Sequence, residues 1–333
     1  MARQPRRTRA DDRGGGGGGG GAVLGAVAVL AWSQVQNVAQ LYGAFALVGL
    51  ASAMLLYHPA FAVVVAITAP ERRANALLTI TLVGGLASTI FIPLTGLLIE
   101  EFGWRDALLV LAAIVAGLSV PLHAIALRRT RAPRTDRHHK ASSPKRVLSD
   151  AGFWLLVVAF VLQNAGQSVL AVYLVTYLTR LGHAATVAAT LAGLLGLLSV
   201  TGRVLTTLAM KRWSIAAITA GVFAVQGVAT ALLPVAGRST AGAAACIVLF
   251  GFGFGISAIA IPAILIDRYG TPGYGTIAGT LGTPVSLSRA LAPLGGALLA
   301  AALGYDALIL IAGLATIASG LSIACLRWLP SRP

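Results

Sequence analysis

The sequence has 333 residues, of which 57% are hydrophobic and only 11% are charged, whereas soluble domains carry about 25% charged residues. This composition excludes a soluble globular protein and indicates a membrane protein with several spans. The net charge of +15 would suit a nucleic-acid partner, but the basic residues lie mostly in loops between apolar segments, so we expect no nucleic acid. Both cysteines fall inside apolar segments, and we expect no disulfide, metal site or cofactor.

The first 21 residues contain five arginines followed by a run of eight glycines. Polyglycine has no side chains to bury and is very flexible, so we expect a disordered tail at residues 1–21. The tail and the apolar segment after it resemble a signal peptide only in part. No small-residue cleavage site followed by a soluble domain is present, and we therefore expect an uncleaved first span.

Ten segments after the tail are long and apolar enough to cross a membrane, for which about 20 residues are needed. Segments of Ala, Val, Leu and Gly at this length have no soluble alternative. The ten expected spans are residues 22–39, 42–67, 76–99, 105–127, 152–178, 186–209, 213–234, 241–266, 275–302 and 306–328.

The basic residues give the orientation of these spans, because Lys and Arg in short loops stay on the cytoplasmic side. If both termini are cytoplasmic, 21 of the 25 basic residues lie on that side. The outer loops then hold only Arg105, Arg180 and Arg238. The high Ala, Gly and Arg content is typical of bacteria, and we expect a multi-pass protein of the bacterial inner membrane with both termini in the cytoplasm.

An internal repeat divides the chain into two related halves. It spans an even number of membrane crossings, so both copies run in the same direction, as in halves related by an axis along the membrane normal. A repeat unit of six spans implies twelve, and the two missing ones would precede residue 22. Ser88, Pro93, Leu94, Gly96, Leu98, Asp106, Ala107 and Leu108 recur 200 positions later as Ser288, Pro293, Leu294, Gly296, Leu298, Asp306, Ala307 and Leu308.

Several segments carry a family resemblance. They are LYHPAFA at 56–62, APERRANAL at 69–77, GGLASTIFIPLTGLLIEEFGWRDAL at 84–108, GLLSVTGRVLTTLAMKRW at 196–213 and DRYG at 267–270. With these segments the chain resembles the major facilitator superfamily of secondary transporters. The resemblance implies two helical bundles, alternating access, and a substrate cavity where the halves meet.

The chain also departs from the family pattern. The first two helices and the Gly-Asp-Arg-Gly loop are absent, MKRW at 210–213 is a degraded form of the matching loop, and IPLTG only partly meets the antiporter pattern. The expected fold is therefore an all-α membrane protein of two bundles with four plus six spans. Its parts are the tail 1–21, an incomplete bundle 22–127, a basic cytoplasmic loop 128–151, a six-helix bundle 152–328 and a short tail 329–333.

Two arginines inside expected spans are candidate substrate ligands, because ionisable groups at membrane depth are costly. Arg289 lies between two prolines and would hold a carboxylate through paired hydrogen bonds. It could equally bond backbone carbonyls freed by those prolines. Arg203 matches the position of a substrate-binding arginine on the eighth helix of the monocarboxylate-transporter-like branch, as the resemblance implies. It could also be a plain anchor at the inner interface.

The remaining candidates are uncharged. Gln163, Asn164 and Gln167 in the fifth span either bind substrate, as the resemblance implies for this helix, or hydrogen-bond neighbouring helices. Tyr57 is a further candidate ligand, and His58 beside it a candidate for proton coupling or for ordinary packing. The glycine-rich run at 251–255 lacks the strand and helix of a phosphate loop, and we expect it to serve close helix packing.

These features predict a monomeric secondary transporter of a small organic solute, with an organic anion preferred and proton coupling as an option. We expect no enzyme, since no catalytic motif is present. One alternative is a truncated, non-functional or regulatory remnant of such a transporter. Another is a ten-helix drug/metabolite exporter, which would divide after the fifth span rather than at the basic loop.

Overall fold

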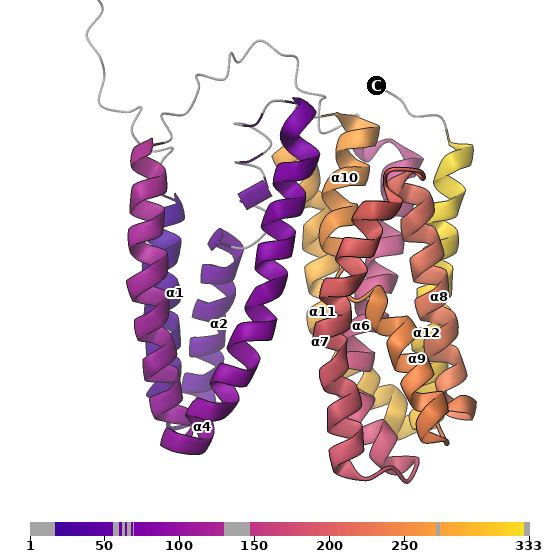
Figure 1. Ribbon diagram of the computed structural model, residues 1–333, viewed down its shortest axis with the longest axis horizontal. Coiled ribbons are helices and arrows are strands. Elements are labelled where there is room, and N and C mark those ends of the chain that lie inside the picture. Colours follow the sequence, from indigo (N-terminus) through magenta and orange to yellow (C-terminus); the bar gives the residue numbers. More distant parts are fainter. Residues whose placement is uncertain are drawn as a thin grey trace, which may run out of the picture. The chain divides into compact units, whose positions relative to one another are not determined.

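The computed structural model describes residues 17–55, 60–61, 64, 68, 70–129, 147–270 and 274–329. Within these residues the regular structure is entirely helical (Figure 1). The chain divides into two compact units. Unit 1 holds residues 1–67 and 90–136, and unit 2 holds residues 68–89 and 137–333.

Unit 1 is built from α1 (Gly17–Ser33), α2 (Val38–Leu55) and the later part of α4 (Pro70–Arg129). Helix α1 begins inside the glycine run, so the expectation of a disordered tail up to Gly21 is wrong for residues 17–21. A methyl group at Gly21 would lie only 3.0 Å from the side chain of Met54. Absent side chains thus allow α1 to approach α2 closely, which favours helix over disorder here.

Helix α4 contains two of the expected spans, because a turn divides it. Gly103 has φ 78° and ψ 166°, which is not helical. The two arms, 70–102 and 104–129, correspond to the expected spans 76–99 and 105–127. Beside the turn, Arg105 Nη2 donates to the carbonyl oxygen of Val35 at 2.8 Å and so ties the second arm to the α1–α2 connection.

Among the described residues of unit 2, seven α-helices follow Asp150, and side chains at helix starts explain several of their boundaries. Asp150, Ser214 and Ser239 each accept a backbone N–H in the first turn of the following helix, which satisfies an otherwise unpaired donor. The helices are α6 (Ala151–Arg180), α7 (Ala185–Ala209), α8 (Ile215–Ala236), α9 (Thr240–Phe252), α10 (Ser257–Tyr269), α11 (Tyr274–Leu303) and α12 (Tyr305–Cys325), with a short 3₁₀ turn at Leu326–Trp328.

In unit 2, α12 packs against α8 and α6, α6 also packs against α11, and α9 packs against α7 and α8 (Figure 1). Glycines form the tightest of these contacts. A side chain at Gly227 would overlap the backbone of Ile317 in α12, and one at Gly313 would overlap the backbone of Ala231 in α8. Small residues let helices approach in a membrane, where apolar burial alone does not hold them together.

Eight helical stretches within the described residues are long and apolar enough to span a membrane, and Gly20–Ser33 is a shorter apolar helix. This total counts the two arms of α4 together as Leu94–Leu122 and leaves out the short first helix, so the expected ten is slightly off as a count of long helices but compatible with the structure. The expected span 241–266 is also not one continuous helix, because it consists of α9 and α10.

Candidate functional site

An interruption between α9 and α10 divides one membrane span of unit 2. Residues 253–256, here called the break, separate Phe252 at the end of α9 from Ser257 at the start of α10. The break lies near the middle of the 30-residue stretch Thr240–Tyr269, about 20 Å from either end at 1.5 Å per residue. It frees backbone groups that need partners at membrane depth.

Two glutamines donate to backbone carbonyls at or just before the break, and a third glutamine binds one of them. Gln226 Nε2 donates to the oxygen of Phe250 at 2.7 Å, and Gln167 Nε2 donates to the oxygen of Phe254 at 2.7 Å. Gln163 Nε2 donates to Gln226 Oε1 at 2.8 Å. The structure therefore brings the two predicted glutamines of α6 together at the break, where they form interhelical hydrogen bonds.

One acceptor in this network is left over. Gln163 is fully buried, and within the described residues its Oε1 atom has no hydrogen-bond partner. A buried amide oxygen without a partner costs about 1–3 kcal/mol, so a water or a ligand hydroxyl beside it would be favoured. Asn164 does not extend the network, because its Nδ2 donates to the oxygen of Phe160 in its own helix at 2.9 Å.

Arg203 of α7 lies against the break. A methyl group at Gly255 would overlap the Arg203 guanidinium and would lie 2.6 Å from Ser199 Oγ. A methyl group at Gly202, the residue before Arg203 in α7, would overlap the backbone of Phe252. These glycine contacts confirm the expected close packing and bring the half-buried Arg203 head group beside the middle of the interrupted span.

Arg289 occupies the middle of α11, and its side chain is exposed within unit 2. Its backbone oxygen accepts a hydrogen bond from Ser168 Oγ at 2.8 Å, which joins α11 to α6. Among the described residues, no hydrogen bond or ion pair links the Arg289 side chain to the break. Tyr57 and His58 lie outside the described residues.

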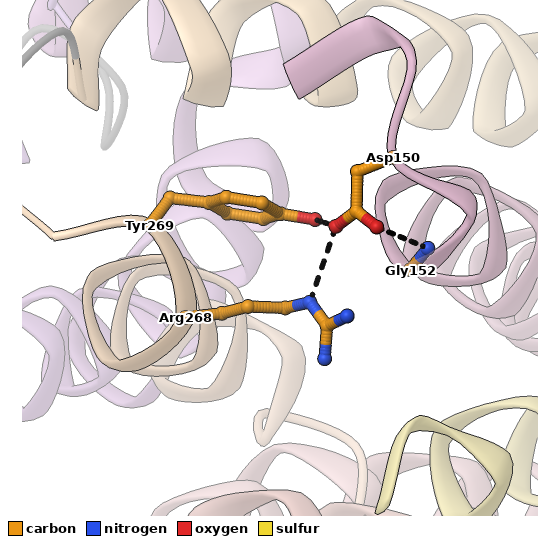
Figure 2. Close-up of polar contacts among 4 residues, drawn as sticks. All are labelled: Asp150, Gly152, Arg268 and Tyr269. Atoms are coloured by element: carbon orange, nitrogen blue, oxygen red, sulfur yellow. Dashed lines mark hydrogen bonds and ion pairs between the residues drawn. The ribbon is translucent and has the colours of Figure 1, made fainter. Parts of the chain in front are cut away.

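A second polar cluster lies where α6 begins and α10 ends (Figure 2). Tyr269 donates its hydroxyl to Asp150 Oδ2 at 2.6 Å, and Arg268 Nε lies 3.4 Å from the same oxygen, with exposed fractions of 8% for Arg268 and 13% for Asp150. The backbone N–H of Gly152 donates to Asp150 Oδ1 at 3.2 Å. One carboxylate thus caps α6 and ties it to the end of α10.

The charge state of Asp150 follows from these contacts. Burial pushes its pKa upward, but the hydrogen bonds from Tyr269 and Gly152, together with the positive charge of Arg268, hold the pKa below its usual value of 3.8. Asp150 is therefore ionised at neutral pH. Within the described residues, no group of three His, Cys, Asp or Glu side chains could hold a metal ion.

Two important residues escaped the sequence reasoning. Gln226 is fully buried and links Gln163 to the break. It is a polar residue inside an apolar span, so the rule that selected Gln163 would also have selected it. Asp150 could not have been found in this way, because its partners are 118 and 119 residues further along the chain.

Comparison with known proteins gives a family and a fold. The family model described as Major Facilitator Superfamily matches residues 16–293. No curated protein sequence matches the chain closely enough to count as a relative.

Solved transporter structures resemble the chain across most of its length. The E. coli fucose:proton symporter FucP, in a variant form, matches with a TM-score of 0.72 and 16% sequence identity, covering 94% of this chain and 83% of that one. The human organic anion transporter MFSD10 matches with a TM-score of 0.66 and 17% identity, covering 93% and 83%. At these identities the likeness establishes the fold alone.

Proposed function

Because the chain belongs to the major facilitator superfamily, we propose that it carries a small organic anion across the bacterial inner membrane by alternating access. The fold of two units and several apolar helices fits this family of secondary transporters. We further propose that it acts as a monomer with both termini in the cytoplasm, on the basis of the distribution of basic residues in the sequence.

The position of Arg203 carries this proposal. Its guanidinium is next to Gly255 in the middle of an interrupted span, rather than at the end of α7 where an interfacial anchor would extend. A guanidinium at that depth attracts an anion strongly, because the surroundings are poorly hydrated. Its planar group of donors also matches the geometry of a carboxylate.

The interrupted span supports a ligand site in its own right. Broken helices at the middle of a membrane protein expose backbone groups that transporters use to hold substrates and ions. Gln163 Oε1 supplies a buried acceptor without a partner in the described part of the chain. In this proposal Arg203 binds the anionic group, and the glutamines keep the break in shape and meet a polar group of the substrate.

Arg289 is the second proposed anion ligand. It lies 15 residues from the start of the 30-residue helix α11, about 22 Å along the axis at 1.5 Å per residue. An exposed arginine at that depth must face water or protein rather than lipid. Such a residue on a helix of unit 2 fits the wall of a substrate pathway.

The choice of an anion has one further support in the comparisons. A solved protein with the same fold is described as an organic anion transporter. Another is described as a fucose:proton symporter, which keeps proton coupling open for this chain, with His58 as the proposed carrier and Tyr57 beside it as a proposed ligand.

The test is uptake of labelled monocarboxylates and of neutral solutes into proteoliposomes, with and without a pH gradient. Arg203→Gln should reduce carboxylate uptake at least tenfold, Arg203→Lys should retain part of it, and Arg289→Ala should abolish it. Arg212→Gln, in an exposed loop after α7, is the matched control and should leave uptake unchanged. If the Arg203→Gln variant and the Arg289→Ala variant are each well folded and still take up carboxylates at the wild-type rate, the proposal is refuted.

A further inference from the structure

A cavity of 840 Å³ lies at the end of unit 2 where α6 and α11 end and α12 begins. Along α6 its lining begins at Tyr173, six residues after Gln167, which binds the break, and it includes none of the residues 253–256. Arg180 at the end of α6 and Arg238 in the α8–α9 connection both line it, together with Tyr305 in the first turn of α12. Cavities of about 300–1,000 Å³ are the usual size for small-molecule sites.

The two arginines are unusual in their location. In the predicted topology only three basic residues lie in outer loops, and two of them, Arg180 and Arg238, converge on this one cavity. Within the described part of the chain, neither forms an ion pair. The first-turn N–H groups of α12 have no side-chain cap, and a helix start adds partial positive charge to the same region.

The acidic residue of the cavity does not cancel this charge by contact. Asp306 accepts a hydrogen bond from the Tyr177 hydroxyl at 2.6 Å. This hydrogen bond holds the carboxylate against the α6 side of the cavity. Counting Arg180, Arg238 and Asp306, the cavity retains a net positive charge.

The arginine-bearing loops are held in place. His183, just after α6, has its Nε2 atom 2.6 Å from the oxygen of Gly237, the residue before Arg238. Arg180 lies over the Tyr305 ring with its guanidinium carbon 4.2 Å from the ring centroid, and Tyr305 meets the Tyr173 ring edge to face at 6.0 Å. The cation and the aromatic wall are therefore preorganised, which lowers the entropy cost of binding.

From this geometry we propose that the cavity is a second ligand site, distinct from the break, that binds aromatic carboxylates at the outer end of unit 2. Arg180 and Arg238 bind the carboxylate by charge-assisted hydrogen bonds. The rings of Tyr173 and Tyr305 contact the flat apolar part of the ligand. The location of this site at the outer end depends on the proposed topology, whereas binding itself does not require transport.

The experiment measures binding of benzoate and 2-naphthoate to the full chain in phosphatidylcholine nanodiscs by calorimetry. Binding is measured in an Arg203→Gln background, which removes the first proposed anion ligand of the transport site, and again in an Arg289→Ala background, in which uptake is expected to be abolished. We expect benzoate binding to persist in both backgrounds, and benzamide to bind at least tenfold more weakly than benzoate. Arg180→Gln and Arg238→Gln should each weaken benzoate binding about tenfold. Arg212→Gln is the matched control and should have no effect.

Two results would overturn the cavity proposal. One is the absence of aromatic carboxylate binding in both the Arg203→Gln and the Arg289→Ala background, and the other is binding that neither Arg180→Gln nor Arg238→Gln weakens. The proposed transport function fails separately, through unchanged uptake in the Arg203 and Arg289 variants. The two proposals can therefore be rejected independently of each other.

Discussion

The turn at Gly103 in unit 1 and the turn at Gly304 in unit 2 belong to the two copies of the internal repeat. Their backbones are nearly the same, with φ 78° and ψ 166° at Gly103 and φ 85° and ψ 168° at Gly304. In both, a guanidinium lies over the aromatic residue that follows the glycine, at 4.3 Å for Arg105 on Trp104 and 4.2 Å for Arg180 on Tyr305. The origin of that guanidinium differs.

In unit 1 the arginine is the next residue in the chain, and it binds the Val35 oxygen at 2.8 Å. In unit 2 one residue rather than two separates the glycine from the repeated aspartate, and Arg180 comes from α6 instead. Bringing the cation from another helix encloses a cavity that includes a second arginine, Arg238. Local sequence therefore sets the shape of the turn, whereas the neighbouring helices decide whether the turn borders a cavity.

The largest effect is expected from replacing the glycines of the two turns, and it tests whether the turns are equivalent. Gly103→Ala and Gly304→Ala should each destabilise the protein by about 3 kcal/mol, because this backbone region is essentially restricted to glycine. A methyl group at either position meets no atom within 4 Å among the described residues, so the cost comes from the backbone alone. Thermal unfolding in detergent measures it, with Gly193→Ala as a helical control that should lose nothing. Markedly unequal losses would mean that the turns are not equivalent.

Gly96 and Gly296 are equivalent positions of the repeat, but their surroundings differ. A methyl group at Gly296 would lie 2.9 Å from Tyr173 Cε2, whereas one at its counterpart Gly96 meets nothing within 4 Å among the described residues. Gly296→Ala should therefore cost about 1–2 kcal/mol through overpacking, and Gly96→Ala should be neutral or slightly stabilising. Unfolding temperatures of the pair measure this difference, and equal values would contradict it.

An effect of similar size is expected where α6 begins and α10 ends. Asp150→Asn should cost about 1.5 kcal/mol at neutral pH, since it weakens hydrogen bonds to a charged group. Asp267→Asn, at an exposed position next to Arg268, is the control and should be silent.

The Asp150 contribution should also depend on pH. Its folded-state pKa is below the ordinary value of 3.8, so the stability it adds is present above that value and is lost as the pH falls through the folded pKa. The unfolding temperatures of wild type and Asp150→Asn should therefore differ at neutral pH and converge only below about pH 4. Convergence already near pH 6 would argue against an ionised, paired Asp150.

The smallest effect is expected from the two cation–aromatic pairs, Arg105 with Trp104 and Arg180 with Tyr305. Arg105→Gln and Arg180→Gln should each cost about 0.5 kcal/mol, as expected for exposed pairs of this kind. Chemical denaturation measures the cost, and Arg180→Gln alone should also weaken benzoate binding. A similar loss of benzoate binding in Arg105→Gln would remove the proposed distinction between the units.

Much of the fold could be predicted from the sequence, and the reason is physical. Backbone groups in a membrane must be satisfied within the span, so long apolar segments have only one conformation to adopt. Among the described residues the expected spans fall on helices, although α1 ends at Ser33 rather than at 39 and the part of the span 42–67 after Leu55 lies largely outside the described residues. The two main exceptions are the interruption at Gly253 and the earlier start of α1 at Gly17. Both exceptions involve glycine runs, whose backbone conformation depends on what packs against them.

The candidate site, too, has residues that the sequence indicates and contacts that only the packing of the helices determines. The sequence by itself indicated Gln163, Gln167 and Arg203, because a polar group inside an apolar span is costly and needs a partner. Only the tertiary structure decided what those partners are, since Gln226, Phe254 and Gly255 lie 63, 87 and 52 residues further along the chain than Gln163, Gln167 and Arg203 respectively. The cavity of Arg180 and Arg238 depends still more on packing, because each arginine alone is an ordinary loop residue. Their shared electrostatic field arises only where α6, α11 and α12 meet.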